Sequence, residues 1–228
     1  MESVPVTFEI QIVFGEVQGN EGFIQGRGFS ALIYNSFTDK FLLFDTGSEG
    51  ESLIHNIEQC GVEISAIKKV IISHNHAEHS GGLEGLYSKN HDIEIYVPIE
   101  NSIAYNRKYS NSKVIGVAEY TEIDTNIYST GQLGNYLKEQ AVFLKTPEDQ
   151  MIILVGCAHP GLDELIMLAK SKGPIKAIIG GFHNSRNFSS LQNIEFIGPC
   201  HCTQNLDSIK QKFPEQFNEI IVGKALMF

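Results

Sequence analysis

Short apolar runs alternate with amphipathic stretches along the whole chain. Apolar runs of about four to eight residues that are bounded by turn residues are typical of buried strands. The predicted strands are Thr7–Phe14, Ala31–Tyr34, Phe41–Phe44, Lys69–Ile72, Glu94–Val97, Val114–Val117, Ala141–Lys145, Met151–Val155, Ile175–Ile179, Ile194–Ile197 and Glu219–Val222.

Three amphipathic stretches predict helices. Glu51–Gln59 is expected to end at Gly61. Gly161–Lys170 carries one apolar stripe, and Gln204–Lys212 is expected to begin after Thr203 as its N-cap. The polar segment 100–112 is interpreted as a surface helix rather than a lid, and the glycine-rich segment 15–29 as a long mobile loop. With no repeat and no linker, residues 1–228 are predicted to form a single domain.

Composition narrows the class of protein. Apolar residues make up 42% of the 228 residues and charged residues 19%, as in a soluble globular protein. The formal net charge is -10, from 17 basic and 27 acidic residues, so we expect no nucleic-acid partner. An anionic small molecule stays a plausible substrate, because bound metal ions invert the local field.

Neither a secretory signal nor a membrane span is recognisable, so no membrane partner and a cytoplasmic location are expected. The four cysteines are Cys60, Cys157, Cys200 and Cys202, which are too few for a disulfide scaffold in a chain of this length. Reduced thiols are therefore predicted. Inert buried thiols are the favoured interpretation, ahead of a thiol ligand or a redox role.

The candidate chemistry begins at SHNHAEH, residues 73–79, directly after the apolar run Val70–Ile72. His74, His76, Glu78 and His79 lie within six positions there, and imidazole and carboxylate groups bind divalent metals at neutral pH. A strand keeps His74 and His76 on one face, because its side chains alternate. The turn that follows can direct Glu78 and His79 to a second position, so one loop is predicted to serve two metals.

Three further histidines also follow apolar runs: His159, His183 and His201. Ligand pockets in α/β sheets form at the carboxyl ends of strands, so these side chains are expected to converge with residues 74–79. A first metal site is predicted at His74, His76 and His159. A second is predicted at Glu78, His79 and His201. Two metals about 3.5–4 Å apart activate a water and stabilise charge on a leaving oxygen.

The motifs FDTG (44–47) and SHNHAEHSGGL (73–83) resemble the metallo-β-lactamase fold superfamily, whose hallmark is His-x-His-x-Asp-His. ILVGCAHPG (153–161), AIIGGFH (177–183) and IGPCHCT (197–203), with STGQL (129–133) and EQAVFLKT (139–146), are similar to one branch. That branch contains the archaeal dihydropterin ribofuranosylaminobenzene 5′-phosphate synthases and many metal-dependent hydrolases. The resemblance extends from about residue 8 to residue 222.

The resemblance implies an α/β fold, namely an αββα four-layer sandwich of two mixed β-sheets flanked by helices, with metals at one sheet edge. It maps the family's metal ligands onto His74, His76, His79, His159 and His201. It also implies that Asp45 orients a ligand histidine without itself binding metal. Two divalent metal ions are expected, with zinc favoured and iron or manganese as alternatives, and a homodimer is the expected assembly.

Two positions depart from the family pattern. Glu78 replaces the aspartate of the first motif, and we interpret it as a metal ligand or alternatively as a general base. The motif IIGGFH lacks the usual bridging aspartate and carries His183 two residues later. Substrate contact or acid–base work is favoured for His183, because the ordinary imidazole pKa of about 6.5 suits proton transfer.

Three functions follow as hypotheses. The first is a metal-dependent hydrolase that acts on a small ester or phosphoester. The second is a pterin-type transferase that releases pyrophosphate, for which Tyr105, Arg107, Lys108 and Phe29 are substrate-binding candidates. The chain looks short for that branch between residues 85 and 140, so hydrolysis is preferred. The third is a metal- or ligand-binding protein with weak catalysis.

Overall fold

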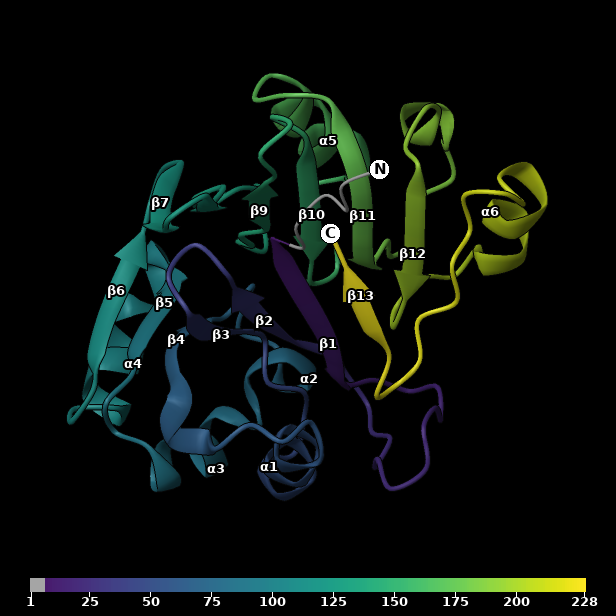
Figure 1. Cartoon of the computed structure of the whole chain (residues 1–228). Helices are drawn as coiled ribbons and strands as arrows, with labels where there is room; N and C mark the ends of the chain where they lie inside the picture. Colours follow the sequence, from purple (N-terminus) through teal and green to yellow (C-terminus); the bar gives the residue numbers. More distant parts are fainter. Residues whose placement is uncertain (1–6) are drawn as a thin grey trace.

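Two mixed β-sheets form the centre of the computed structural model, which describes residues 7–228 (Figure 1). The first sheet has the order β13-β1-β2-β3-β4-β5-β6, and the second has the order β12-β11-β10-β9-β8-β7. The strands of the first sheet are β1 (Phe8–Phe14), β2 (Ser30–Asn35), β3 (Lys40–Phe44), β4 (Ile67–Ile71), β5 (Glu94–Pro98), β6 (Lys113–Val117) and β13 (Ala225–Met227). Those of the second are β7 (Thr121–Asp124), β8 (Ile127–Ser129), β9 (Val142–Lys145), β10 (Met151–Val155), β11 (Ile175–Gly181) and β12 (Phe196–Cys200).

Each sheet contains a parallel block. In the first sheet β3, β4, β5 and β6 are parallel neighbours, and in the second β10, β11 and β12 are. The remaining neighbours pair antiparallel, including β1 with β2 and β9 with β10. Parallel strands place their carboxyl ends at the same edge of a sheet, so the turns that follow β3, β4, β10, β11 and β12 are brought together in two rows.

Helices cover the outer faces and complete four layers. The α-helices are α1 (Gly50–Gln59), α2 (Ala77–Ser80), α3 (Leu83–Lys89), α4 (Ser102–Lys108), α5 (Leu162–Lys170) and α6 (Leu206–Lys212). Single 3₁₀ turns lie at η1 (Ile64–Ala66), η2 (Ile99–Asn101) and η3 (Ser189–Leu191). The predicted αββα arrangement of two mixed sheets flanked by helices is confirmed.

Three buried apolar clusters hold the layers together. The cluster between the sheets joins Ile10 and Ile33 of the first sheet to Leu144 and Ile152 of the second. A second cluster packs α5 and α6 on the second sheet, and a third packs α1, α3 and α4 on the first. Each fully buried leucine or isoleucine contributes about 1.5–3 kcal/mol relative to an exposed position, so the layers are held by many modest contributions.

The predicted elements agree with the structure where an apolar run is regular. Two predicted elements differ from it, a strand and the start of the last helix. Glu219–Val222 is not a strand, because its Ile220 and Val222 are buried by loop packing rather than by pairing in a sheet. The last helix begins at Leu206 with Asn205 as its N-cap. Thr203 Oγ1 instead accepts a hydrogen bond from the Phe182 backbone N–H and donates to the carbonyl of Cys200.

Segment 100–112 forms η2 and α4, as predicted, although Tyr105 and Tyr109 are buried in the cluster of α1, α3 and α4. Segment 15–29 has neither helix nor strand, as expected for a loop. Strands β7, β8 and β13 and helices α2 and α3 were not predicted, because these elements are short or have few apolar positions. Across residues 7–228 no helix has both the length and the apolar character needed to cross a membrane.

Candidate metal centre

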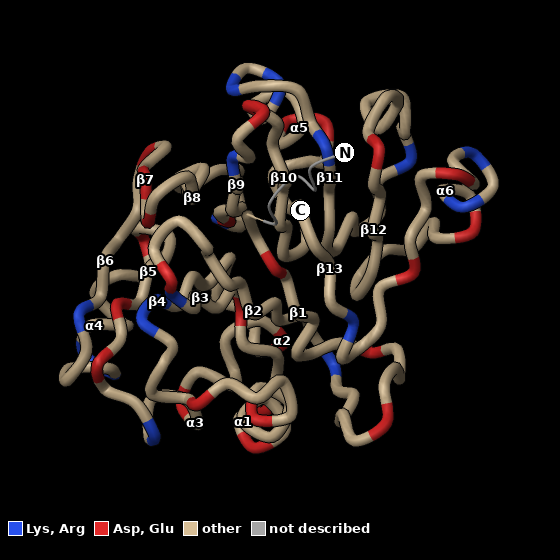
Figure 2. Tube along the Cα trace, viewed as in Figure 1, with Lys and Arg blue, Asp and Glu red and all other residues tan. Residues whose placement is uncertain are grey.

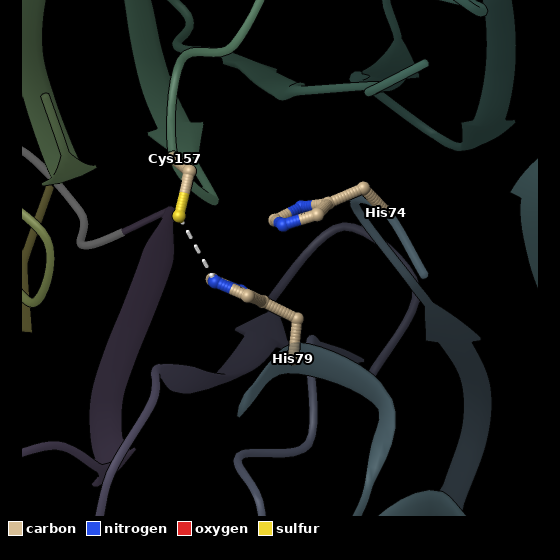
Figure 3. A group of neighbouring side chains, drawn as sticks. All are labelled: His74, His79 and Cys157. Atoms are coloured by element: carbon tan, nitrogen blue, oxygen red, sulfur yellow. Dashed lines mark hydrogen bonds between the residues drawn. The ribbon is translucent and has the colours of Figure 1, made fainter. Parts of the chain in front are cut away.

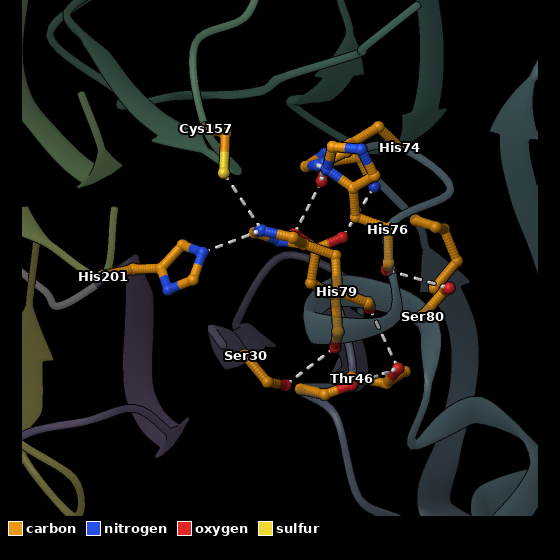
Figure 4. Close-up of polar contacts among 12 residues, drawn as sticks. Ser30, Thr46, His74, His76, His79, Ser80, Cys157 and His201 are labelled. Carbon is orange, nitrogen blue, oxygen red and sulfur yellow. Dashed lines mark hydrogen bonds and ion pairs between the residues drawn. The ribbon is translucent and has the colours of Figure 1, made fainter. Parts of the chain in front are cut away.

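Potential metal-binding side chains from three strand ends, those of β4, β10 and β12, meet at one edge of the two sheets (Figure 4). Residues 73–79 follow β4 and run into α2, and Asp45 follows β3. Cys157 and His159 follow β10, and His201 follows β12. The predicted convergence therefore exists in the folded chain, and it includes a cysteine that was not among the predicted ligands.

The first donor group consists of His74, His76 and His159. One potential ligand nitrogen from each lies within 4.8 Å of the other two. His74 Nε2 is 3.1 Å from His76 Nδ1, and the His74 and His159 rings are 4.6 Å apart between centroids. His74 is fully buried, whereas His76 is exposed. This group matches the predicted first site and has an open side toward solvent.

The second donor group is centred on His79. Its Nε2 atom is 3.2 Å from His201 Nε2 and also 3.2 Å from Cys157 Sγ. Figure 3 shows the His79 ring directed at the Cys157 thiol, with the His74 ring beside it. His74, His79 and Cys157 again place one donor atom each within 4.8 Å of one another. The two donor groups are thus contiguous.

A buried carboxylate from the first sheet holds the histidines of the β4 turn. Asp45 is fully buried, and its carboxylate accepts hydrogen bonds from the Ser73 backbone N–H at 2.6 Å and the Ser73 hydroxyl at 2.7 Å. His79 Nδ1 lies 2.7 Å from the same carboxylate. Asp45 therefore makes the contact with a ligand histidine that the resemblance implies.

A second buried carboxylate, Glu139, holds the turn after β10 in the other sheet. Its two oxygens accept hydrogen bonds from the backbone N–H groups of Cys157, Ala158 and His159 at 2.8, 3.0 and 2.9 Å. His159 Nδ1 lies 2.7 Å from Glu139 Oε2. Glu139 thus fixes both the turn after β10 and the ring of His159. Sequence reasoning missed it, because it stands in the polar stretch Lys138–Gln140, which resembles a surface loop.

These carboxylates set the tautomers of the histidines. His79 and His159 donate from Nδ1 to Asp45 and Glu139, and His201 Nδ1 lies 3.1 Å from Glu16 Oε1. Each ring then presents an unprotonated Nε2 to the centre. In particular, the Nε2 lone pairs of His79 and His201 face each other at 3.2 Å. In this tautomer a divalent cation between the two rings would use both lone pairs, so the donor set fits a metal ion.

Burial also keeps the histidine rings of the site in their neutral, metal-binding form. Burial lowers the pKa of His74 to about 2, with a further contribution from the charge of His79. Burial and the charge of His201 lower the pKa of His79 to about 3. Both rings are therefore neutral at pH 7, which is the form that binds metals.

The two carboxylates differ in their titration. Burial raises the pKa of Asp45 well above its usual range, and the hydrogen bonds from Ser73 offset only part of that effect. Burial also acts to raise the pKa of Glu139, but the hydrogen bond from His159, the charge of His74 and the backbone N–H donors outweigh it and lower the pKa to about 2. Glu139 is therefore the permanently charged anchor of the site.

Backbone strain gathers at the same strand ends. Asp45, Ala158, His183 and His201 all have positive φ values, between 48° and 57°. Non-glycine residues adopt this left-handed region rarely and at a cost of about 1–3 kcal/mol, and such residues cluster at functional sites. Among residues 7–228, these are four of the eight non-glycine residues with positive φ, and the other four, Asp39, Asn126, Asp149 and Asn193, lie in other turns.

Glu78 lies outside both donor groups found among residues 7–228. Its carboxylate is 3.7 Å from Arg27 Nη2, and its side chain is 21% exposed. Glu78 is in the first turn of α2, and its carboxylate is directed at Arg27 of the loop 15–29. Of the residues of the second predicted site, His79 and His201 lie together with Cys157 beside them, and Glu78 lies apart.

Replacing Glu78 by glutamine is expected to leave the amount of bound metal unchanged, because the carboxylate faces Arg27. Metal content per chain, measured by elemental analysis after reconstitution and gel filtration, tests this expectation. Loss of one metal equivalent would show instead that Glu78 turns inward as a ligand. Glu84→Gln, an exposed substitution on α3, is the matched control.

His183 lies at the edge of the site rather than in a donor group. Its ring is 5.2 Å from the ring of His159 between centroids, and its carbonyl accepts a hydrogen bond from the Gln204 backbone N–H. The side chain is half-buried. This placement suits the expected contact with substrate or acid–base role, and that role stays a prediction.

The loop 15–29 contacts both halves of the site. Near its start Glu16 pairs with His201, and near its end the Phe29 backbone N–H donates to the carbonyl of Glu78. Gly28 has φ +124°, and a Cβ at this position would lie 1.9 Å from the Glu78 carbonyl oxygen. Only glycine allows this approach, so the loop is held against the histidine turn by backbone contact.

Comparisons with known proteins agree with this geometry. The family described as anti-Pycsar protein Apyc1 matches residues 22–100, less than half of the chain. The 7,8-dihydropterin-6-methyl-4-(β-D-ribofuranosyl)-aminobenzene-5′-phosphate synthase of Methanocaldococcus jannaschii is 25% identical over 271 aligned positions, which cover 92% of this chain and 92% of that protein.

Solved structures are similar over nearly the whole chain. Tm1679, a metal-dependent hydrolase of the β-lactamase superfamily, superposes with a TM-score of 0.78 at 24% identity, covering 96% of this chain and 98% of that one. The short form of human tRNase Z superposes with a TM-score of 0.62 at 14% identity, covering 96% and 98%. The chain has the metallo-β-lactamase fold. Its sequence relatives include the dihydropterin synthase branch, as the motifs predicted.

Proposed function

We propose that the protein is a metal-dependent hydrolase of a small phosphoester, with metal positions at the two donor groups. The observation that carries the proposal is the pair of facing Nε2 atoms of His79 and His201, next to a second cluster of imidazoles at His74, His76 and His159. His74, His76 and His159 would hold one divalent ion, and His79 and His201 would take part in holding the other. Bound there, such ions supply an activated water and stabilise negative charge on the leaving oxygen.

A groove beside the histidine turn offers a place for the substrate. It has a volume of about 360 Å³ and is lined by residues of the segment 75–81 and of α4, including Asn75, Ser80, Tyr105 and Lys108. Tyr105 donates a hydrogen bond to Asn75 Oδ1 at 3.0 Å, which fixes the floor next to His76. Lys108, whose ammonium also pairs with Glu84 at 3.0 Å, supplies a positive group, and the tyrosines supply aromatic surface. This lining suits a phosphoester with an aromatic or heterocyclic group.

Charge distribution favours a small substrate over a nucleic acid. Lys and Arg positions are spread over loops and helix ends among acidic residues, rather than forming one continuous stripe in this view (Figure 2). With a net charge of -10, the chain lacks the general attraction for a polyanion that long nucleic acids require. A single phosphoester needs only the local charge of the metal ions and of Lys108.

The proposal is tested with metal-free protein reconstituted with Zn²⁺, Mn²⁺ or Fe²⁺ and assayed on bis(p-nitrophenyl) phosphate, p-nitrophenyl phosphate and p-nitrophenyl acetate. We expect hydrolysis of at least one phosphoester that depends on the added metal and exceeds acetate hydrolysis. Absence of metal-dependent turnover of either phosphoester by metal-loaded protein would overturn the proposal. Metal-loaded protein with no turnover of any of the three substrates would favour the binding-protein hypothesis.

Lys108→Ala is expected to raise KM for the phosphoester about 5- to 30-fold with a smaller change in kcat, because a partly exposed charge contributes about 1–2 kcal/mol to binding an anion. Steady-state kinetics measure the split. Lys113→Ala is the matched control, because Lys113 is an exposed lysine that pairs with Glu94 outside the groove. If both substitutions change KM equally, the groove is not the substrate-binding site.

The second candidate, a pterin-type transferase, is supported by the 25% identity to the dihydropterin synthase over 92% of both chains. The same groove, with its tyrosines and Lys108, suits a pterin and a phosphate. Incubation with a dihydropterin pyrophosphate and an aryl-amine ribose phosphate distinguishes the two functions. Stoichiometric pyrophosphate release that requires both substrates would replace the hydrolase proposal by the transferase.

A further inference from the structure

We propose that Cys157 and Cys202 are metal ligands, so that the metal position beside His79 and His201 is bound through sulfur as well as nitrogen. The inference rests on the proposed function, because it assigns further ligands to one of its two metal positions. It makes the two positions chemically different: the first has three imidazoles, and the second has thiols and imidazoles.

Cys157 lies where the two donor groups meet. Its Sγ atom is 3.2 Å from His79 Nε2 and belongs both to the group with His74 and His79 and to a group with His201 and Cys202. Within each group the donor atoms lie within 4.8 Å of one another. Zn–N bonds of about 2.0–2.1 Å and Zn–S bonds of about 2.3 Å imply ligand separations of roughly 3.3–3.8 Å in a tetrahedral site. The 3.2 Å contacts of His79 with Cys157 and His201 are close to that range.

The fold makes room for the second thiol. Cys202 lies in the turn after β12, and its Sγ atom is 4.0 Å from the carbonyl oxygen of Cys157. At Gly181, the last residue of β11, an added Cβ would lie 2.6 Å from Cys202 Sγ and 3.3 Å from Cys157 Cα. A side chain there would push the two cysteines apart. The small residue between β10 and β12 therefore allows two thiols from different strand ends to approach one point.

The contacts of these thiols are weak or lie within the proposed ligand set, since the Cys202 thiol is 4.0 Å from the Cys157 carbonyl and the Cys157 thiol is 3.2 Å from His79 Nε2. Cys157 is buried, and Cys202 is half-buried, so neither is a simple surface thiol. Cys157 Sγ is 3.2 Å from His79 Nε2, and His79 Nδ1 is 2.7 Å from the Asp45 carboxylate. Cys157 is shared by two groups, one with His74 and His79 and the other with His201 and Cys202. Thiols combined with imidazole nitrogens in this way form a donor set typical of zinc or ferrous iron.

Binding through sulfur has a defined chemical balance. Each thiol that becomes a ligand forms one metal–sulfur bond and releases its proton to solvent, with no change of oxidation state. Thiolates favour Zn²⁺, Fe²⁺ and Co²⁺ over the harder Mg²⁺ and Mn²⁺, which favour oxygen ligands. We therefore expect the sulfur-containing position to retain its metal more strongly than the three-histidine position during dialysis against a weak chelator.

Cobalt substitution tests the inference without relying on activity. Metal-free protein loaded with two equivalents of Co²⁺ should show a near-ultraviolet absorption band from thiolate-to-cobalt charge transfer. Cys157→Ser and Cys202→Ser should each reduce this band by about half, and the double variant should lose it. Cys60→Ser is the matched control and should keep the full band, because Cys60 lies at the end of α1, away from the site. No band in wild-type protein with cobalt bound, or an unchanged band in both single variants, would overturn the inference.

A second measurement needs no variant and covers the case in which a serine variant does not fold. Alkylation of Cys202 by iodoacetamide, followed by peptide mass spectrometry, should be at least tenfold slower in the Zn²⁺-loaded protein than in the metal-free protein. Cys60 should react at the same rate in both forms. Equal rates at Cys202 would contradict its role as a ligand.

The outcomes separate this inference from the proposed function. If the metal-loaded protein hydrolyses a phosphoester but shows no thiolate band, the sulfur ligands are refuted and the hydrolase proposal is retained. If the protein shows a thiolate band but hydrolyses no phosphoester, the sulfur ligands are retained and the hydrolase proposal is refuted.

Discussion

His159→Ala is expected to remove one metal equivalent and to lower kcat/KM for the phosphoester about a thousandfold. The ring supplies one of three nitrogens of the first donor group and is held by Glu139 at 2.7 Å. Loss of the ion forfeits several kcal/mol of transition-state stabilisation, and each 1.36 kcal/mol corresponds to a factor of ten in rate. His74→Ala should have the same effect on metal and activity, with an added loss of stability because His74 is fully buried.

Metal content and kinetics are measured on the same preparations, and circular dichroism establishes that each variant is folded. His91→Ala serves as the control, because His91 is an exposed histidine that packs on Tyr87 outside the site. Unchanged turnover in His159→Ala or His74→Ala would refute the hydrolase proposal. Normal metal content with lost activity would instead make these rings substrate-binding groups.

Glu139→Gln is expected to weaken metal binding 10- to 100-fold and to destabilise the protein by about 2–4 kcal/mol. The amide nitrogen cannot accept hydrogen bonds, so one pair of the four donors that now face Glu139 would be left without an acceptor in a buried site. The ring of His159 would also lose the partner that fixes its tautomer. Urea unfolding of the metal-free protein and competition with a coloured chelator measure the two effects.

Glu148→Gln is the control for this substitution, because Glu148 is exposed in the turn after β9. A merely structural role for Glu139 would lower the unfolding free energy and leave the metal affinity of the folded protein unchanged. If the stability and the metal affinity of Glu139→Gln both equal those of Glu148→Gln, the carboxylate is not an anchor of the site.

The sequence predicted those features that depend on residues close together in the chain. Apolar runs predicted most strands within two residues, because burial of a strand demands apolar side chains locally. The histidines at 74, 76, 79, 159 and 201 could be grouped in advance, because each follows such a run and parallel strands end at a common edge. Asp45 was assigned only through the family resemblance, since nothing local distinguishes it from an ordinary turn residue.

The rest depended on packing between distant segments. Glu139 becomes a buried anchor only when its loop folds over the end of β10, and its neighbours in sequence give no sign of that burial. Cys157 becomes a donor only because the second sheet places β10 opposite the β4 turn. Glu78 was expected to face the site, but the pairing with Arg27 depends on where the loop 15–29 lies. Contacts of this kind are properties of the tertiary structure.

The candidate metal centre takes its members from both sheets, since His74, His76 and His79 come from the first and Cys157, His159 and His201 from the second. An ion held by members from both sheets would cross-link two halves of the molecule. It would stabilise the native state by about 4 kcal/mol when its free concentration is a thousandfold above its dissociation constant. The ligands also extend from residue 74 to residue 201 along the chain. During synthesis from the N-terminus the complete centre cannot form until β12 has emerged, so we expect metal loading to be a late event in folding.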